Sequence, residues 1–230
     1  MTRIAAVPLV LAALLAACGQ SQSPPASTAA APAVELTAPA GTYKLDPNHA
    51  SLVGKVQHMN LAPYNVRFAK FDVTLNLDPR NLAASSVEVT VDPTSVRTDY
   101  TGDYKATHED SPFNSFEEAL AQGPKFFNAG QFPAITFKST NVQPQGAGSL
   151  KITGDLTLLG KTHPFTLDAT LTGAMAEHPY AKVGALGFSA TGTFKRSPFG
   201  MDFGVGKFLD DDVTVYFDGE FQQQVAPPPG

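Results

Sequence analysis

The chain of 230 residues has one cysteine, no tryptophan and few basic residues. A single thiol cannot build an intramolecular disulfide framework. The 16 Lys and Arg residues against 21 Asp and Glu residues give a formal net charge of −5, which would repel a nucleic-acid backbone. No apolar run reaches the roughly 20 residues that cross a bilayer as a helix. These deficits exclude a disulfide-rich scaffold and disfavour nucleic acid as a partner.

The sequence also lacks the signatures of common enzyme classes. It contains no Gly-x-Ser-x-Gly, no His-Glu-x-x-His and no glycine-rich phosphate loop ahead of a helix. His108-Glu109-Asp110 and the run 210–212 are charged, but neither has a recognised metal-ligand spacing. We therefore expect a protein that is not an enzyme and that needs no metal or cofactor.

The N-terminus has the layout of a bacterial lipoprotein signal. Arg3 provides a positive start, residues 4–14 are mostly apolar, and Leu15-Ala16-Ala17-Cys18 follows. Leu-Ala-Ala-Cys resembles a lipobox, in which the cysteine thiol accepts a diacylglyceryl group. We predict a signal peptide over residues 1–17 and lipidation of Cys18. The alternative is an ordinary secretory signal with an incidental cysteine.

Residues 18–40 are predicted to be a disordered tether that begins at the lipidated cysteine. Of the 22 residues from 19 to 40, 16 are Ala, Pro, Ser or Thr, and none is aromatic. Such a segment cannot bury enough apolar surface to fold. Acylation would anchor the protein in the bacterial cell envelope facing the periplasm, and Gly19 after the cysteine favours the outer membrane. A proline-rich tail is predicted over residues 225–230.

The body of the chain, residues 41–224, reads as a β-rich domain. All 16 phenylalanines and 6 tyrosines lie after residue 42. Apolar and polar side chains alternate over 71–77, 87–91, 152–158 and 213–217, which is typical of strands with one buried face. Turn-forming sequences separate these stretches. The pattern predicts eight or nine antiparallel strands.

Such strands must close into a barrel or pair as a sandwich, and closure removes exposed edges. We therefore predict an all-β fold: an antiparallel, lipocalin-like β-barrel of about eight strands, wide enough to hold one small ligand. A true lipocalin is disfavoured, because its first strand carries a Gly-x-Trp signature and this chain has no tryptophan. One short helix is predicted from Ser115, which has the capping-box spacing to Glu118, up to Gly123-Pro124.

Six separated motifs span nearly all of residues 41–224: Tyr43–Ala50, Val56–Met59, Phe132–Thr140, Gly154–Thr162, Arg196–Met201 and Asp211–Val213. Together and in this order they resemble the motifs of the YceI-like family. The resemblance implies a periplasmic or secreted bacterial domain whose lipocalin-like barrel holds a polyisoprenoid lipid in an internal tunnel. The chain departs from the family pattern at Ala50, at Val66 and in about a dozen extra residues over Tyr100–Asn114, beside the expected tunnel mouth.

Three basic or potentially basic side chains share the parity of inward-facing residues. These are Arg67, Arg196 and His58, provided that no bulge intervenes in their strands. A buried unpaired charge is costly, so each needs a carboxylate, a ring of carbonyls or a bound anion. We interpret them as a collar for a ligand head group such as pyrophosphate or quinone. The alternative is a structural role, either in ion pairs with acids such as Asp46 and Asp202 or on the outside after a bulge.

Inward-facing apolar residues either line a tunnel or fill a core. Gly154, Ala169, Ala190 and Gly192 share the inward parity and leave room that a packed interior would not. Together with the family resemblance, this favours a tunnel. Its predicted lining is Phe71, Val73, Leu75, Phe137, Leu156, Leu158, Phe188, Ala190, Phe194 and Phe217.

The predicted function is the binding of a long apolar ligand, a polyisoprenoid or an isoprenoid quinone, for storage, transport or sequestration in the cell envelope. The expected partners are the isoprenoid lipid and, through acylated Cys18, the membrane. The oligomeric state stays open, with a homodimer among the options. One alternative is a structural or stress-protective envelope lipoprotein with a packed barrel. The other is a hydrolase or isomerase that acts on such a lipid.

Overall fold

The computed structural model describes residues 36–225. The predicted signal peptide, Cys18, residues 18–35 of the predicted tether and the tail from residue 226 lie outside the described residues. The strands are β1 (Gly41–His58), β2 (Ala62–Phe68), β3 (Phe71–Leu77), β4 (Ser86–Val91), β5 (Val96–Thr98), β6 (Ile135–Gly146), β7 (Ser149–Leu158), β8 (Lys161–Met175), β9 (Ala185–Lys195) and β10 (Leu209–Gln223).

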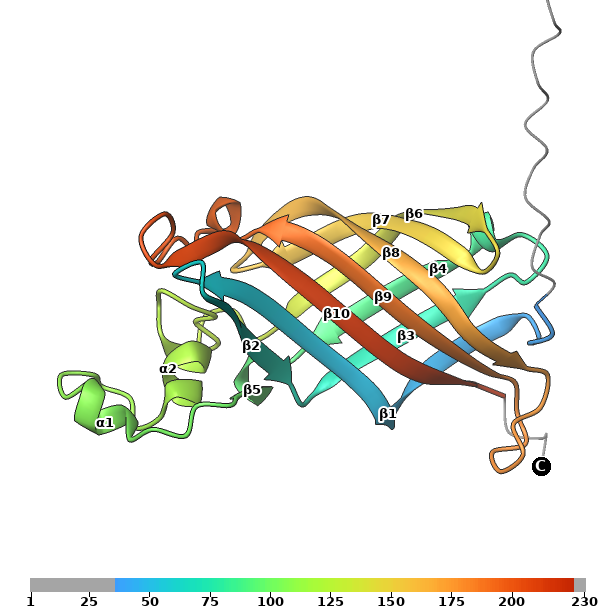
Figure 1. Ribbon diagram of the computed structural model, residues 1–230. Helices are drawn as coiled ribbons and strands as arrows, with labels where there is room; N and C mark the ends of the chain where they lie inside the picture. The colour runs from blue at the N-terminus through green and yellow to red at the C-terminus, as the bar shows by residue number, and fades with distance from the viewer. Residues whose placement is uncertain (1–35, 226–230) are drawn as a thin grey trace, which may run out of the picture.

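These strands form one antiparallel sheet that closes on itself (Figure 1). Neighbours follow the order β10-β9-β8-β7-β6-β4-β3-β1-β2-β5, and pairing of β10 with β1 closes the ring. The first part of β1 pairs with β3 and the last part with β2, so β2 and β3 act as one interrupted strand. β4 and β5 do the same against β3 and β2. The predicted eight-stranded antiparallel barrel is confirmed.

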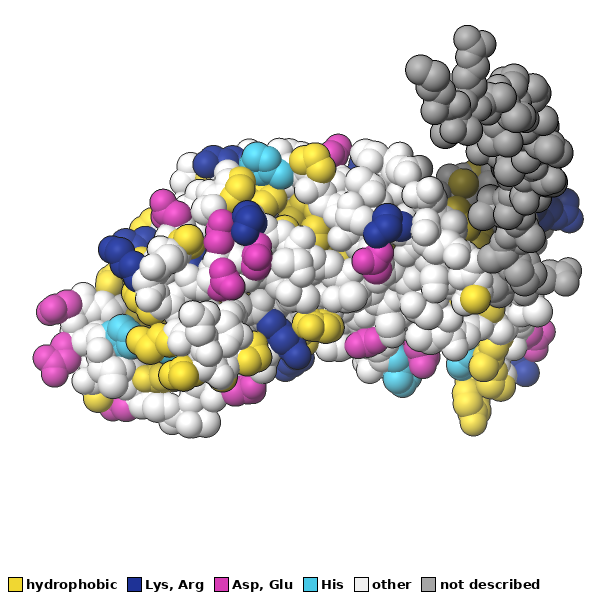
Figure 2. All heavy atoms as spheres, turned by 45° about the horizontal axis from the view of Figure 1, so that its top comes forward, with side chains coloured by type: hydrophobic (Ala, Val, Ile, Leu, Met, Phe, Trp, Pro, Cys, Tyr) yellow, Lys and Arg dark blue, Asp and Glu magenta, His cyan; other side chains and the backbone are white. Residues whose placement is uncertain are grey.

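The alternation read in the sequence produces two different faces. In β3, Val73 and Leu77 are buried while Asp72 and Asn76 are exposed. The outer face carries acidic and basic side chains interspersed with one another, as the view in Figure 2 shows. Some of them pair across neighbouring strands, as Lys151 and Asp168 do at 2.6 Å. The barrel therefore has a polar, mixed-charge exterior around an apolar interior.

Two α-helices and three 3₁₀ turns interrupt the strands. The predicted helix forms as α2 (Phe116–Gln122): Ser115 Oγ accepts a hydrogen bond from the Glu118 N–H at 3.0 Å, and the helix ends at Gly123. The four-residue α1 (Tyr104–Thr107) lies in the insertion and was not predicted. Within residues 36–225, no helix has the length and apolarity needed to cross a membrane. The 3₁₀ turns are η1 (Leu82–Ala84), η2 (Pro93–Ser95) and η3 (Ser197–Phe199).

The two ends of the barrel are covered differently (Figure 1). At one end residues 36–40 pack against the core: Ala38 is 1% exposed, and the Tyr43 hydroxyl donates to the Pro39 carbonyl oxygen at 2.7 Å. These five residues end the predicted tether, yet they belong to the folded domain. At the α2 end, the ring of Phe127 packs edge-on against Phe68, with their centroids 5.3 Å apart.

Candidate functional site

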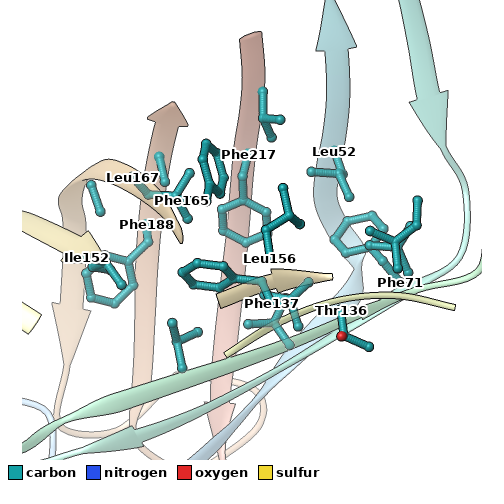
Figure 3. Close-up of a pocket in the computed structure, with 18 of the residues that line it drawn as sticks. Leu52, Phe71, Thr136, Phe137, Ile152, Leu156, Phe165, Leu167, Phe188 and Phe217 are labelled. Carbon is teal, nitrogen blue, oxygen red and sulfur yellow. The ribbon is translucent and has the colours of Figure 1, made fainter. Parts of the chain in front are cut away.

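The barrel encloses an apolar cavity of about 210 Å³. Among the 33 residues that line it, only Ser85, Ser86 and Thr136 are polar, and none carries a charge. The lining comes from every wall of the barrel, from Leu52 on β1 round to Phe217 on β10. Figure 3 shows the labelled phenylalanine side chains converging from different strands on one space. The space can hold an apolar chain, and it offers no charged partner to a ligand.

All ten residues of the predicted tunnel lie on the wall of this cavity. Each faces inward because side chains two apart on a strand share a face. Their rings meet edge to face around the space: the centroids of Phe71 and Phe217 are 6.3 Å apart. Whether they contact a ligand stays a prediction. The ten are Phe71, Val73, Leu75, Phe137, Leu156, Leu158, Phe188, Ala190, Phe194 and Phe217.

The open space does not come from Gly154 and Gly192, two of the small residues with inward parity. A Cβ atom on Gly192 would lie 2.8 Å from Phe165 Cζ, and one on Gly154 would lie 2.7 Å from Phe137 Cζ, so a ring from the neighbouring strand covers each glycine. The expectation that these two positions leave room is therefore wrong. Ala169 and Ala190, which face each other across β8 and β9, do line the cavity.

The polar residues of the lining are engaged elsewhere. Ser85 Oγ accepts a hydrogen bond from the Asp78 N–H at 3.0 Å, and Ser86 Oγ accepts one from Asn76 Nδ2 at 3.3 Å. Thr136 is exposed on the outer face of β6. The side chains that line the cavity therefore offer apolar contacts and no free hydroxyl.

The prediction that Arg67 faces the interior is wrong. Arg67 is exposed, whereas Val66 lines the cavity and Phe68 is buried. The parity was counted back from β3, but two residues outside either strand, Ala69 and Lys70, separate β2 from β3. This break in the strand reverses the inward-facing parity, which is how an irregularity re-aims side chains.

His58 keeps the predicted parity but does not reach the interior. It is exposed at the end of β1, and its ring lies near that of Phe208, with the centroids 6.4 Å apart. No hydrogen bond joins any two of His58, Arg67 and Arg196 in the described part of the chain. The predicted collar is therefore not assembled in this structure.

Arg196 is buried, as its parity predicts, and is 3% exposed. Its Nε donates to the Asp210 carbonyl oxygen and its Nη1 to the Met201 carbonyl oxygen, each at 2.9 Å. Within residues 36–225 no carboxylate lies within 4.0 Å of its nitrogens, and Nη2 has no hydrogen-bond partner. Burial lowers the pKa of the guanidinium, although nearby acids oppose the shift. Backbone carbonyls thus hold Arg196 in place of an ion pair.

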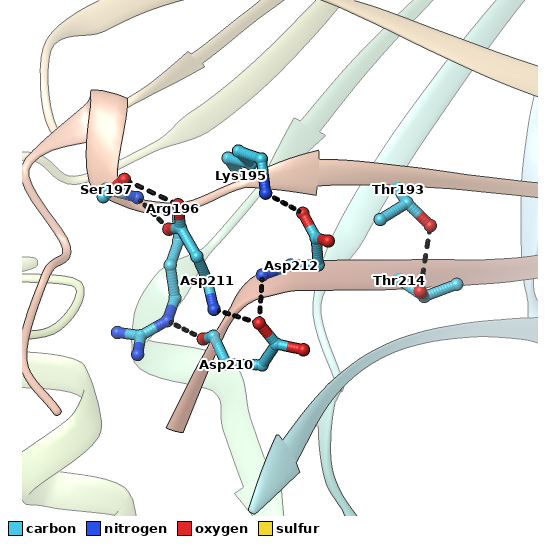
Figure 4. Close-up of polar contacts among 8 residues, drawn as sticks. All are labelled: Thr193, Lys195, Arg196, Ser197, Asp210, Asp211, Asp212 and Thr214. Atoms are coloured by element: carbon cyan, nitrogen blue, oxygen red, sulfur yellow. Dashed lines mark hydrogen bonds and ion pairs between the residues drawn. The ribbon is translucent and has the colours of Figure 1, made fainter. Parts of the chain in front are cut away.

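Asp211 ties the start of β10 to η3 (Figure 4). Its carboxylate accepts hydrogen bonds from the Ser197 N–H and the Ser197 hydroxyl, each at 2.8 Å. Burial tends to raise the pKa of Asp211, but these bonds and the charges of Lys195 and Arg196 hold it below the ordinary value. The folded state therefore favours the ionised carboxylate.

This carboxylate should make the stability of the barrel depend on pH. A pKa lowered by folding stabilises the protein above the unfolded value, about 3.9 for Asp, and the contribution is lost as the pH falls through the lower folded value. Asp211→Asn should therefore flatten the acid limb of a plot of unfolding free energy against pH. Urea titrations between pH 2 and 7 measure it, with exposed Asp155→Asn as the comparison. An unchanged acid limb would show that the bonds to Ser197 do not stabilise the ionised form.

A polar cluster that sequence reasoning missed lies on the outside of the barrel. Residues 46–49 bulge from β1 opposite Glu220 on β10. As a result, a carboxylate oxygen of Asp46, a ring nitrogen of His49 and a carboxylate oxygen of Glu220 lie within 4.8 Å of one another. His49 Nδ1 is 3.0 Å from the Asp46 carboxylate. This contact raises the pKa of His49 and lowers that of Asp46. The group acts as a surface ion pair, and the signal for it was the bulge, which the sequence alternation does not reveal.

The insertion folds beside the barrel and contributes no side chain to the cavity lining. Tyr104 of α1 is buried and packs near Phe116, as does Tyr100 with a centroid distance of 5.4 Å. Tyr64 on β2 meets the same Phe116 ring edge-on. The insertion therefore anchors α2 rather than shaping the cavity wall.

The chain resembles known bacterial proteins over most of this barrel. The family model described as the YceI-like domain matches residues 43–221. The chain is 36% identical over 190 residues to the protein YceI of Escherichia coli, covering 81% of this chain and 91% of that protein. A UPF0312 protein of Vibrio cholerae is 34% identical over 190 residues, with 81% and 92% covered.

Solved structures share the fold at lower sequence identity. BcnA of Burkholderia cenocepacia superposes with a TM-score of 0.59 at 23% identity, covering 76% of this chain and 98% of that one. A structure from Saccharophagus degradans, described as a polyisoprenoid binding domain, gives a TM-score of 0.54 at 12% identity, with 79% and 98% covered. At these identities the likeness establishes the barrel fold alone.

Proposed function

We propose, from the premise that this chain belongs to the YceI-like family, that its barrel binds a long apolar lipid, a polyisoprenoid or an isoprenoid quinone. The observation that carries the proposal is the cavity inside the eight-stranded barrel. Residues from strands all around the barrel line it, and none of the lining side chains is charged. A domain of the same fold that is described as binding polyisoprenoids supports this ligand class.

The physics of the cavity favours a slim, flexible chain. The cavity, at about 210 Å³, is smaller than a typical drug-binding pocket of about 300–1,000 Å³. Each methylene moved from water into such a wall contributes about 0.8 kcal/mol, so affinity should rise with chain length until the space is filled. A polyisoprenoid provides this length without polar atoms that the wall could not satisfy.

We further propose storage, transport or sequestration rather than conversion of this lipid. The support is the chemistry of the wall, whose only side-chain hydroxyls belong to Ser85, Ser86 and Thr136. Within residues 36–225, none of these has a histidine or carboxylate partner that would activate it as a nucleophile. A binding protein needs only the apolar wall.

Extraction of the purified protein tests the proposal. Organic solvent followed by mass spectrometry should recover an isoprenoid lipid in near-stoichiometric amount, and the delipidated protein should rebind it. Failure to recover or rebind any such lipid would favour a structural envelope protein. Conversion of the rebound lipid on incubation would instead favour the hydrolase or isomerase alternative.

We also propose that the protein acts in the bacterial cell envelope, anchored through an acylated Cys18. The support is the signal-like sequence that precedes it. In a detergent phase separation of membranes prepared from the cells, the wild-type protein should enter the detergent-rich phase and the Cys18→Ser variant the aqueous phase. Partition of the wild-type protein into the aqueous phase would contradict the anchor, and with it the expected outer-membrane location.

A further inference from the structure

Within residues 36–225, two buried side-chain polar atoms have no hydrogen-bond partner, the Tyr64 hydroxyl and Arg196 Nη2, and only Nη2 belongs to a charged group. Arg196 is 97% buried, because only 3% of the residue is exposed, yet Nη2 makes no hydrogen bond. We propose that Arg196 Nη2 donates to an uncharged oxygen, a carbonyl, ether or hydroxyl, at the polar end of the apolar ligand. This assignment rests on the proposed function and names the head-group chemistry for the same site.

The position of Arg196 fits this role. Arg196 comes directly after β9 and before η3, two residues beyond Phe194, which lines the cavity. In Figure 4 the guanidinium lies on the opposite side of the strands from the outward pair Lys195 and Asp212. Phe194 and Phe127, both on the cavity wall, pack against the cluster that contains Met201, whose carbonyl Arg196 holds. Arg196 is not itself a lining residue, but its bond to Met201 places it beside the part of the cavity wall that Phe194 and Phe127 form.

A ligand oxygen would accept the hydrogen bond that Arg196 Nη2 does not make within the protein. An amide or guanidinium N–H that is buried without an acceptor loses its bond to water and gains none in return. The Asp210 and Met201 carbonyl oxygens accept from Nε and Nη1, and neither accepts from Nη2. An acceptor on the end of a bound chain would supply the hydrogen bond that Nη2 lacks. Ligand binding would then also provide the missing hydrogen-bond acceptor for Arg196 Nη2.

The charges around Arg196 favour an uncharged acceptor over an anion. Burial lowers the pKa of the Arg196 guanidinium, and the negative charges of Asp202, Asp210 and Asp211 partly offset this shift. With Lys195 and its partner Asp212 included, two cations face four carboxylates, so this group of charges is net negative. A phosphate or pyrophosphate brought to Nη2 would be repelled by them. This differs from the expectation of an anion shared among three basic residues, two of which are exposed.

Three probes with the same isoprenoid chain test the assignment. They are geranylgeranylacetone, which carries a ketone, the corresponding hydrocarbon without oxygen, and geranylgeranyl phosphate. Affinities are measured by displacement of a fluorescent fatty-acid probe from the delipidated protein. We expect the wild-type protein to bind the ketone about tenfold or more tighter than the hydrocarbon, as a hydrogen bond to a charged donor provides. We expect no gain for the phosphate.

Arg196→Met should remove the preference for the ketone, so that the ketone and the hydrocarbon bind with affinities within about twofold of each other, because methionine is an unbranched side chain without a donor. Arg97→Met is the matched control, since Arg97 is exposed and its Nη1 bonds only to the Val96 carbonyl oxygen. If Arg196→Met does not fold, the ¹⁵N side-chain resonances of Arg196 in the wild-type protein should shift with the ketone and not with the hydrocarbon.

The outcomes separate this assignment from the proposed function. Equal affinity for the ketone and the hydrocarbon would overturn the assignment while leaving apolar binding intact. Tighter binding of the phosphate, lost in Arg196→Met, would overturn the uncharged head group. Binding of none of the probes would overturn the proposed function, and this assignment with it.

Discussion

Ala190→Phe should abolish the binding of a long isoprenoid chain, with a loss of affinity of at least about a hundredfold. Ala190 lies on the cavity wall opposite Ala169 on β8 and Phe217 on β10, at a place where small side chains leave the interior open. A phenyl ring there would occupy space that the ligand needs. Because the ring enters existing space, the free energy of unfolding should change by less than the about 1–3 kcal/mol of overpacking in a filled core.

Thr191→Phe is the matched control, since its side chain lies on the outer face one residue along the same strand. It should leave ligand affinity within about twofold, as expected for a surface change away from the site. Displacement titrations and thermal melts of both variants provide the two readouts. A large loss of stability in Ala190→Phe with unchanged binding would mean that the interior is packed and that the ligand lies elsewhere.

The sequence predicted the barrel well because the decisive signal is local. Alternation within a strand identifies its buried face, and closure follows from the need to remove sheet edges. The helix from Phe116 to Gln122 was equally readable, because its cap at Ser115 lies within three residues of Glu118. Every predicted tunnel residue that was counted within one continuous strand lies on the cavity wall.

The errors arose where parity was carried across an irregularity. Arg67 was counted from β3 through Ala69 and Lys70, which belong to neither strand, and it emerged on the outside. The bulge at residues 46–49, which gathers the cluster with Glu220, has no sequence signature in the alternation either. Both depend on register against a neighbouring strand, which is a non-local property.

The source of the cavity was also beyond sequence reasoning. A glycine and an alanine at inward positions look alike in a parity pattern, yet rings of Phe137 and Phe165 lie over Gly154 and Gly192 while the alanines stay uncovered. Which small residue a neighbouring ring covers depends on side-chain rotamers across strands. The same holds for Arg196, whose carbonyl partners lie 5 and 14 residues away.

Tyr43→Ala should cost about 3–5 kcal/mol in the free energy of unfolding, the range for truncating a large buried aromatic side chain. Tyr43 is 0% exposed and packs with Ala38, Leu77 and Phe221 in the cluster that closes the barrel end away from α2. It pairs through β1 with both β3 and β10, so its loss leaves a cavity at the seam where the barrel closes.

Tyr43→Phe separates packing from hydrogen bonding at this seam. It keeps the ring but removes the hydroxyl that donates to the Pro39 carbonyl oxygen at 2.7 Å, so it should cost about 1 kcal/mol. It should also speed hydrogen exchange at the Gln224 N–H, which bonds to the Thr42 carbonyl oxygen beside it. Urea unfolding of both variants measures the two losses in the free energy of unfolding. Tyr180→Ala is the control, because Tyr180 is 89% exposed. Equal losses for the two variants would place the stabilisation in the hydroxyl rather than in the packing that closes the barrel.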